Sequence, residues 1–306
     1  MRTSENTSGA GRVERVEVLT GERAGEVREL LAAAAAADGR EAVSEAGRLR
    51  VRADSPRAGV SHLVQSVDGV VTGYGQVEGE RPGTVELTVA PGERGRGLGA
   101  ELVRAVLAGA DGALDFWAHG GLPAARHLAE VHGAVLVREL RQMRRTAAAP
   151  EAVTVPAGVE LRTFEPGRDE EAWLALNALA FAHHPEQGAW TARDLAERMA
   201  EPWFDPKGFF LAERDGGLVG FHWTKVQPDG LGEVYVVGVD PAEQGNGLGK
   251  ALTAAGLRHL ALERGLPTVM LYVDADNAAA VRVYERLGFA VHEVDLMYRW
   301  EPTSGR

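Results

Sequence analysis

The sequence contains no cysteine among its 306 residues. Disulfide bonds, thiolate metal sites and a cysteine nucleophile are therefore excluded. It also has no apolar run near the roughly 20 residues that span a bilayer. Its polar beginning, MRTSENTSGAGR, has no apolar core typical of a secretion signal. We expect a cytoplasmic protein whose residues 1–14 form a disordered tail.

Basic side chains are the scarcer charged class. The sequence has 33 Lys and Arg against 44 Asp and Glu, which gives a formal net charge of −11. This balance disfavours nucleic acid or an anionic membrane as the main partner. Hydrophobic residues make up 45% and charged residues 25%, as in ordinary soluble proteins. A chain of this length is expected to form about two domains.

One motif is present twice in the chain. Residues 85–107 read VELTVAPGERGRGLGAELVRAVL, and residues 235–257 read YVVGVDPAEQGNGLGKALTAAGL. Ten of the 23 positions are identical when the second segment is set 150 residues after the first. Such a period is too long for a solenoid and predicts two tandem copies of one domain.

Each half has the same order of predicted elements. The first half has a helix-rich segment at 26–47, a hairpin with a glycine turn at 61–78 and a buried strand at 84–90. The second half has helix-rich segments at 169–184 and 191–200, a hairpin at 208–227 and a buried strand at 233–240. In both halves a glycine-rich loop with a helix, a further strand, a short helix and a final strand follow. This order predicts an α+β fold with a mixed sheet. We expect an N-terminal domain over 15–146, a linker over 147–158 and a C-terminal domain over 159–306.

The two glycine-rich loops are candidates for phosphate binding. Glycines expose backbone N–H groups, and a helix N-terminus adds the positive end of its dipole. A simple tight turn is the alternative, and two loops at matching places favour a phosphate site. GRGLGA at 95–100 fits a dinucleotide pattern, but Lys250 breaks it in the second copy. The nucleoside-triphosphate pattern fails at Gln244 and Ala251.

A third pattern, Arg/Gln-x-x-Gly-x-Gly, fits both copies. It is carried by Arg94, Gly97 and Gly99 in the first half and by Gln244, Gly247 and Gly249 in the second. NAAAVRVYERLGF at 277–289 follows at the expected distance. These motifs resemble those of the GCN5-related N-acetyltransferases. The resemblance covers most of 15–300 and implies two tandem acyltransferase domains that use acetyl-CoA and no metal.

The resemblance also implies which residues bind acetyl-CoA. The strand before the loop would bind the pantetheine arm, the loop would bind the pyrophosphate, and the segment after the next strand would line the other side. In the second half these residues are Val237, Gly238, Val239, Gln244, Gly245, Asn246, Gly247, Leu248, Gly249, Lys250, Asn277, Ala278, Ala279, Ala280, Val281 and Arg282. In the first half they are Leu87, Thr88, Val89, Arg94, Gly95, Arg96, Gly97, Leu98 and Gly99.

Two catalytic residues are expected in the second half. Tyr284 stands where the family has its general acid, with a packing tyrosine as the alternative. Glu233, near the start of the buried strand, is the candidate general base, directly or through a water, with an exposed strand-end carboxylate as the alternative. Without a cysteine, and with no Gly-x-Ser-x-Gly element, we favour direct attack in a ternary complex.

A narrower resemblance concerns the acceptor. FAHHPEQGAW at 181–190, the Trp-Thr-Lys of 223–225 and GEVYVVGVDP at 232–241 are similar to a family of tandem acetyltransferases. That family acetylates the cysteinyl amine of cysteinyl-glucosaminyl-inositol. The resemblance implies acceptor contacts by Asp38, Glu186, Lys225, Glu233 and Tyr272. For Asp38 a solvated acid at a helix end is the alternative. His183 and His184 match no metal motif such as His-Glu-x-x-His.

Other functions stay open at this point. The alternatives are a tandem acetyltransferase for an aminoglycoside, a polyamine or a peptide N-terminus, and a non-catalytic acyl-CoA sensor, against which the presence of both Glu233 and Tyr284 argues. We expect a monomer that takes a small-molecule substrate. When the two halves are aligned 150 residues apart, Glu233 of the second half corresponds to Gly83 of the first. When they are aligned 155 residues apart, Tyr284 corresponds to Ala129 and Asn277 to Leu122. We therefore expect the first half to bind CoA or to act structurally without catalysing.

Overall fold

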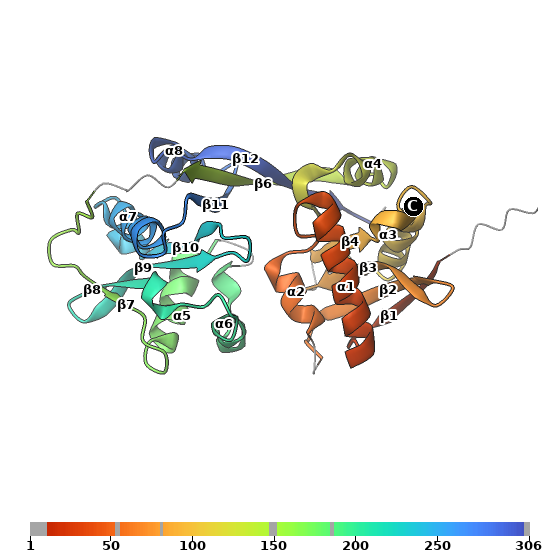
Figure 1. Ribbon diagram of the computed structural model, residues 1–306, viewed down its shortest axis with the longest axis horizontal. Coiled ribbons are helices and arrows are strands. Elements are labelled where there is room, and N and C mark those ends of the chain that lie inside the picture. The colour runs from red at the N-terminus through yellow and green to blue at the C-terminus, as the bar shows by residue number, and fades with distance from the viewer. Residues whose placement is uncertain (1–10, 53–55, 80–81, 147–151, 184–186, 303–306) are drawn as a thin grey trace, which may run out of the picture. The chain divides into compact units, whose positions relative to one another are not determined.

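The computed structural model describes residues 11–52, 56–79, 82–146, 152–183 and 187–302. The chain divides into two compact units, each with its own helices and sheet (Figure 1). Unit 1 comprises Met1–Leu140 and Glu293–Arg306, and unit 2 comprises Arg141–His292. Each unit is an α+β structure with a mixed sheet, which agrees with the fold class expected from the sequence.

Unit 1 begins with a strand that the sequence had placed in the tail. Residues 12–14 belong to β1, because Arg12–Val16 pair antiparallel with His62–Ser66. The elements that follow are α1 (Gly21–Asp38), α2 (Glu45–Val51), β2 (Val60–Val67), β3 (Val70–Glu78), β4 (Gly83–Val89), α3 (Leu98–Ala108), β5 (Leu114–Ala118), α4 (Pro123–Val131) and β6 (Val135–Thr146). Strand order in this sheet is β1-β2-β3-β4-β5.

Unit 2 repeats this order of elements. They are β7 (Glu160–Thr163), α5 (Glu170–Ala180), α6 (Ala192–Met199), β8 (Phe209–Arg214), β9 (Gly217–Val226), β10 (Gly232–Val239), α7 (Leu248–Arg258, continued by a π-helical turn over His259–Glu263), β11 (Thr268–Asp274), α8 (Ala278–Arg286) and β12 (Ala290–Trp300). The sheet order is β7-β8-β9-β10-β11, so both units place their fourth and fifth strands side by side in parallel.

Local sequence explains the equivalent hairpins. β2 and β3 are joined by Asp68-Gly69, and β8 and β9 by Asp215-Gly216; all four residues have positive φ angles. Asp-Gly suits such two-residue turns because both positions are left-handed. Four of the described helices, α1, α2, α6 and α8, also begin where a side chain accepts a hydrogen bond from a free backbone N–H group. Thr191 and Asp194, for example, form a reciprocal capping box at the start of α6.

Each sheet carries helices on both faces. In unit 2, α5 packs with Phe209, Phe221 and Trp223 of the sheet in an aromatic core, whereas Leu257 of α7 and Val281 of α8 pack with Val234 on the other face. Val234 therefore marks the α7–α8 face of β10, and its neighbour Glu233 lies on the α5–α6 face, because successive side chains alternate along a strand.

The last strand of each half is grouped with the other unit. Leu296–Trp300 of β12 pair antiparallel with β5, in unit 1. Met143 of β6 belongs to the core of unit 2, where β6 neighbours β11. A division at the expected linker, 147–158, would put residues 141–146 in unit 1 and residues 293–306 in unit 2. The structure instead groups 141–146 with unit 2 and 293–306 with unit 1.

Buried charges hold the C-terminal segment in unit 1. His119, which follows β5, lies between Glu86 of β4 (Nε2 to Oε1, 2.7 Å) and Asp295 (Nδ1 to Oδ2, 3.4 Å). Burial alone would lower the pKa of His119, but its hydrogen bonds to Asp295 and Glu86 outweigh burial and raise the pKa to about 10. The same contacts, with the Ser44 amide, hold the pKa of Glu86 below its ordinary value despite burial. The imidazolium is therefore part of the folded unit.

We predict that this imidazolium makes unit 1 less stable at alkaline pH. Its raised pKa gives stability that is fully present below about pH 6.5 and is lost as the pH rises towards 10. His119→Gln should lower the free energy of unfolding near pH 6 by about 3 kcal/mol, because two buried carboxylates lose their partner. It should also remove the slope above pH 6.5, which reaches about 1.4 kcal/mol per pH unit.

Urea unfolding at pH 6, 8 and 9.5, followed by circular dichroism, measures both effects. His127→Gln, on the exposed side of α4, is the matched control. An unchanged alkaline slope in His119→Gln would contradict the assignment.

Candidate active site

The central feature of unit 2 is an irregularity in β10. The antiparallel pairing with β9 shifts between Val234 and Val236, so Tyr235 is an extra residue, a β-bulge. In the part of the chain that the structure describes, parallel pairing with β11 stops at Val234 and Leu271, although β10 continues to Val239. The edge of β10 that faces β11 is therefore open from Tyr235 onward.

The glycine-rich loop follows directly from this open edge. Gly245 and Gly247 have φ angles of 84° and 91°, and Gly247 caps α7. A Cβ atom at either position would meet no atom within 4 Å, so the left-handed backbone angle, and not crowding, is what calls for glycine. Unit 1 has the same arrangement at Gly95 and Gly97, with φ angles of 75° and 88° at the start of α3.

The predicted cofactor residues fall into three adjacent structures. Those of 237–239 form the open end of β10, those of 244–250 form the loop and the first turn of α7, and those of 277–282 begin α8. Asn277 caps α8 by accepting a hydrogen bond from the Ala280 amide at 3.1 Å. An open strand edge, left-handed glycines and a helix N-terminus fit the amides and phosphates of CoA. In unit 1, residues 87–89 end β4 and 94–99 form its loop.

Three predicted acceptor residues share one face of the unit 2 sheet. Glu233 on β10 lies directly opposite Lys225 on β9, and both are only 4% exposed. Gln227 donates a hydrogen bond to Glu233. Tyr272 lies on β11 beside Leu271 and is 42% exposed. Because Leu271 belongs to the α7–α8 core, Tyr272 points to the same face as Glu233.

The predicted acid lies on the opposite face. Tyr284 is a partly buried residue of α8 that packs against the cluster containing Val234, and its ring is 5.9 Å from that of Phe289. Burial raises the pKa of Tyr284 above its ordinary value. The candidate base and the candidate acid therefore flank β10 from opposite faces, at the level where β10 and β11 separate.

The other two predicted acceptor residues, Asp38 and Glu186, lie outside the described part of unit 2. Asp38, at the end of α1 in unit 1, receives two hydrogen bonds from Arg94, at 2.6 and 2.8 Å. Asp38 is thus an ion-pair partner of the unit 1 loop rather than a solvated acid. Glu186 lies outside the described residues, as does His184.

Comparison of the two units corrects one alignment. Both β4 and β10 begin with a glycine that pairs with the fifth strand, Gly83 with Leu114 and Gly232 with Val269. Glu233 therefore corresponds to Thr84, not to Gly83, because the bulged Tyr235 shifts the offset by one residue. β4 has no such shift in its pairing with β3. Over α4 and α8 the offset of 155 holds, so Ala129 stands in place of Tyr284.

Several residues at the site had no sequence signal. Gln142, 8% exposed on β6, donates a hydrogen bond to the Tyr272 hydroxyl at 3.0 Å. It comes from the first half of the chain, so no motif connects it with β11. Trp203 and Tyr235 lie 4.5 and 5.0 Å from the Lys225 ammonium, measured to the ring centroids. Tyr235 was read only as part of a buried strand, since a bulge has no sequence pattern of its own.

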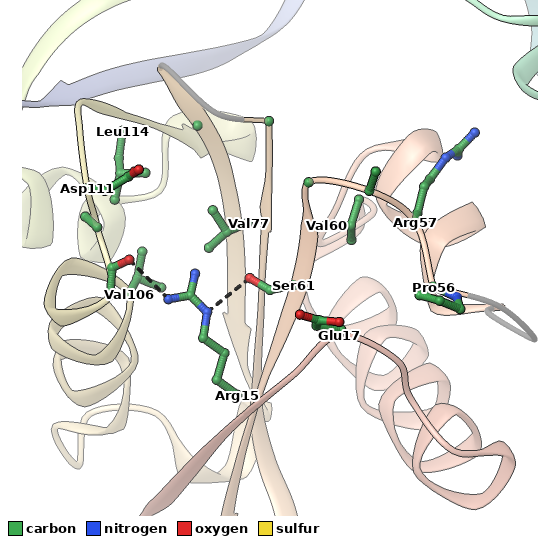
Figure 2. Close-up of a pocket in the computed structure, with 16 residues that line it drawn as sticks. Arg15, Glu17, Pro56, Arg57, Val60, Ser61, Val77, Val106, Asp111 and Leu114 are labelled. Atoms are coloured by element: carbon green, nitrogen blue, oxygen red, sulfur yellow. Dashed lines mark hydrogen bonds between the residues drawn. The ribbon is translucent and has the colours of Figure 1, made fainter.

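A cavity of about 580 Å³ lies elsewhere in unit 1 (Figure 2). Arg15 crosses it and donates hydrogen bonds to Ser61 Oγ at 3.1 Å and to the Gly109 carbonyl at 3.4 Å. Gly83 begins β4 and Gly109 follows α3, so the cavity is at the end of both elements opposite the glycine loop. No predicted site residue lines it.

Two searches of the described residues were negative. No group of three or more His, Asp or Glu residues is arranged to hold a metal ion. None of the helices in that part of the chain combines the length and apolarity needed to cross a membrane.

Known proteins share the fold of this chain. Residues 173–289 match the acetyltransferase (GNAT) family model. A solved tandem GNAT protein from the clavulanic acid biosynthesis pathway has a TM-score of 0.73 at 20% identity, over 96% of this chain and all of the other. A GCN5-related N-acetyltransferase from Sphaerobacter thermophilus has a TM-score of 0.65 at 26% identity, over 96% and 97%. The class is thus a tandem GNAT acetyltransferase, as the sequence motifs predicted.

Full-length relatives narrow this class. A mycothiol acetyltransferase of Streptomyces griseus subsp. griseus is 59% identical over 94% of this chain and 95% of its own length. One from Thermomonospora curvata is 53% identical over 93% and 96%. The chain belongs to the mycothiol acetyltransferase family, which is the narrower family that the acceptor motifs resemble. Its acetyl donor is acetyl-CoA, which confirms the expected cosubstrate.

The two glycine loops give a matched test of which unit uses its loop in turnover. Gly247→Ala forces a side chain into a left-handed backbone, which costs about 1–2 kcal/mol. We expect the KM for acetyl-CoA to rise about tenfold, since about 1.4 kcal/mol corresponds to a factor of ten. Gly97→Ala imposes the same strain in unit 1 and should leave kcat/KM within about twofold. Equal losses in both variants would mean that the unit 1 loop also takes part in turnover.

Proposed function

We propose that unit 2 transfers the acetyl group of acetyl-CoA to the cysteinyl amine of cysteinyl-glucosaminyl-inositol, giving mycothiol. The observation that carries the proposal is the bulge in β10, which has no counterpart in β4, on a strand that carries the buried carboxylate of Glu233 near its start and leads into the glycine loop at its end. The 59% identity to a mycothiol acetyltransferase supports this choice of acceptor.

Each residue has a separate part in the proposed chemistry. Glu233, as a carboxylate, takes a proton from the acceptor ammonium, directly or through a water, and so frees the amine lone pair. Backbone N–H groups of residues 237–239 donate hydrogen bonds to the thioester carbonyl oxygen. The new C–N bond forms as the C–S bond breaks, and Tyr284 gives its phenolic proton to the departing thiolate. The nitrogen then loses its second proton, which passes through water and restores the phenol of Tyr284. Direct transfer needs no enzyme nucleophile, in keeping with the absence of cysteine.

Unit 1 is assigned a supporting role. Thr84 and Ala129 occupy the positions of Glu233 and Tyr284, so unit 1 offers neither a matching base nor a matching acid. Its glycine loop retains the geometry of a CoA site, although Arg94 is engaged by Asp38. The expected domain functions, the monomeric state and the cytoplasmic location stay predictions.

The proposed base and acid are tested by conservative variants. Glu233→Gln keeps the size and hydrogen-bonding capacity of the side chain but cannot accept the proton, so kcat should fall about 10²–10⁴-fold. Product formation from acetyl-CoA and cysteinyl-glucosaminyl-inositol is followed by mass spectrometry. Spermine, an aminoglycoside and a peptide amine are tested in parallel. Transfer only to one of these amines would replace the proposed acceptor, and no transfer to any would favour a non-catalytic acyl-CoA sensor.

The raised pKa of Tyr284 predicts the alkaline side of the pH profile. Because burial keeps the phenol protonated beyond pH 10, loss of the acid should reduce kcat only above that pH. Tyr284→Phe should lower kcat at all pH values and lack this alkaline decrease. Initial rates between pH 7 and 10.5 with saturating substrates measure the difference. If kcat of the wild type decreases well below pH 10 and the same decrease persists in Tyr284→Phe, the decrease belongs to a group other than Tyr284.

A further inference from the structure

Lys225 is unusual in this protein. The chain contains three lysines, at 207, 225 and 250, among 33 basic residues. Lys207 and Lys250 are exposed, whereas Lys225 is 4% exposed. A buried ammonium needs compensation, because removing it from water is costly unless charges or dipoles replace the lost hydration.

Two aromatic rings provide part of that compensation. The Lys225 ammonium lies 4.5 Å from the centroid of Trp203 and 5.0 Å from that of Tyr235. The two rings are 5.1 Å apart and inclined at 63°, so they form two walls around one cation. Both distances are within the range in which a cation is attracted by the negative face of a ring.

A third residue fixes one wall. Arg198, 5% exposed at the end of α6, donates a hydrogen bond from Nε to the Tyr235 hydroxyl at 2.8 Å. Its own position is fixed by a bond from Nη1 to the Asp194 carbonyl at 3.0 Å and by stacking on Trp190, 3.9 Å from the ring centroid. Helix α6 packs against α5, as Figure 1 shows. Because Tyr235 is the bulged residue, the bulge itself directs this ring towards Lys225.

Unit 1 lacks this arrangement. The position of Lys225 is occupied by Glu78, which lies opposite Thr84 and accepts a hydrogen bond from Arg50. The charge is reversed and β4 has no bulge. The aromatic enclosure thus occurs in the unit to which we assign catalysis.

We propose that Trp203 and Tyr235 form an aromatic box that positions the Lys225 ammonium for the acceptor, and that Arg198 is a positioning residue that holds the Tyr235 wall. The inference rests on the proposed function, because the narrower family resemblance implies that Lys225 contacts the acceptor whose acetylation is proposed. The box determines the affinity for the acceptor, because it fixes the position of the Lys225 ammonium. Glu233 and Tyr284 act separately, as the base and the acid that transfer protons.

The kinetic test separates acceptor binding from chemistry. Trp203→Leu removes one wall and should raise the acceptor KM about tenfold, while kcat and the KM for acetyl-CoA change less than about twofold. Trp203→Phe retains a ring and should recover most of the affinity. Tyr235→Phe keeps its ring but loses the Arg198 hydrogen bond, so its effect should match that of Arg198→Met.

The matched control is Trp117→Leu. Trp117 lies in unit 1 with the Arg138 guanidinium 5.1 Å from its ring, so this variant loses a cation–π contact away from Lys225. It should leave the acceptor KM unchanged. Equal rises in Trp117→Leu and Trp203→Leu would overturn the proposal, as would an unchanged acceptor KM in Trp203→Leu.

A second readout does not depend on activity. With ¹³C-labelled lysine in the full chain, the ε-methylene protons of Lys225 should be shifted upfield by the rings relative to Lys207 and Lys250. This shift should largely disappear in Trp203→Leu and persist in Trp203→Phe, and its absence in the wild type would overturn the box. If the wild type acetylates a different amine, the proposed function fails, and the same variants test the box with that amine.

Discussion

The separation of β10 from β11 after Val234 is the constraint on which the site depends. A parallel pair that stayed in register to Val239 would bury the backbone groups of residues 237–239 in a ladder. The bulge at Tyr235 shifts the pairing of β10 with β9 on one edge, and the separation of β10 from β11 leaves the other edge open. A strand with free N–H groups leading into a left-handed glycine loop can bind amides, a carbonyl and phosphates in succession along one ligand.

The same irregularity divides the chemistry between two faces. Glu233 and Lys225 lie with the aromatic residues of the α5–α6 side, and Tyr284 lies with the apolar core of the α7–α8 side. An acceptor amine and a departing thiolate are thus served by groups that do not compete for one proton. In unit 1 a regular β4 carries Glu86, which is engaged by His119 and Ser44 and stabilises the unit. In the proposed function the two copies of one fold have different roles, and the extra residue in β10 is one structural difference between them.

Much of this arrangement was predictable. The repeat of 85–107 in 235–257 predicted two equivalent folds, and glycines at 95, 97, 245 and 247 predicted the left-handed loops before α3 and α7. The Asp-Gly turns predicted both hairpins. These features depend on residues within a few positions of one another, where glycine, proline and capping side chains restrict the backbone directly.

The sequence by itself determined the class of fold, the phosphate loops and the identity of the catalytic candidates, because local patterns and motifs carry them. Only the tertiary structure decided the offset between the units, the place of 293–300 beside β5 and the enclosure of Lys225 by Trp203 and Tyr235. The bulge depends on the partner strand, the strand exchange on backbone hydrogen bonds that any sequence can make, and the box on residues 22 and 10 positions from Lys225. Contacts between distant segments are set by packing, and no local pattern records them.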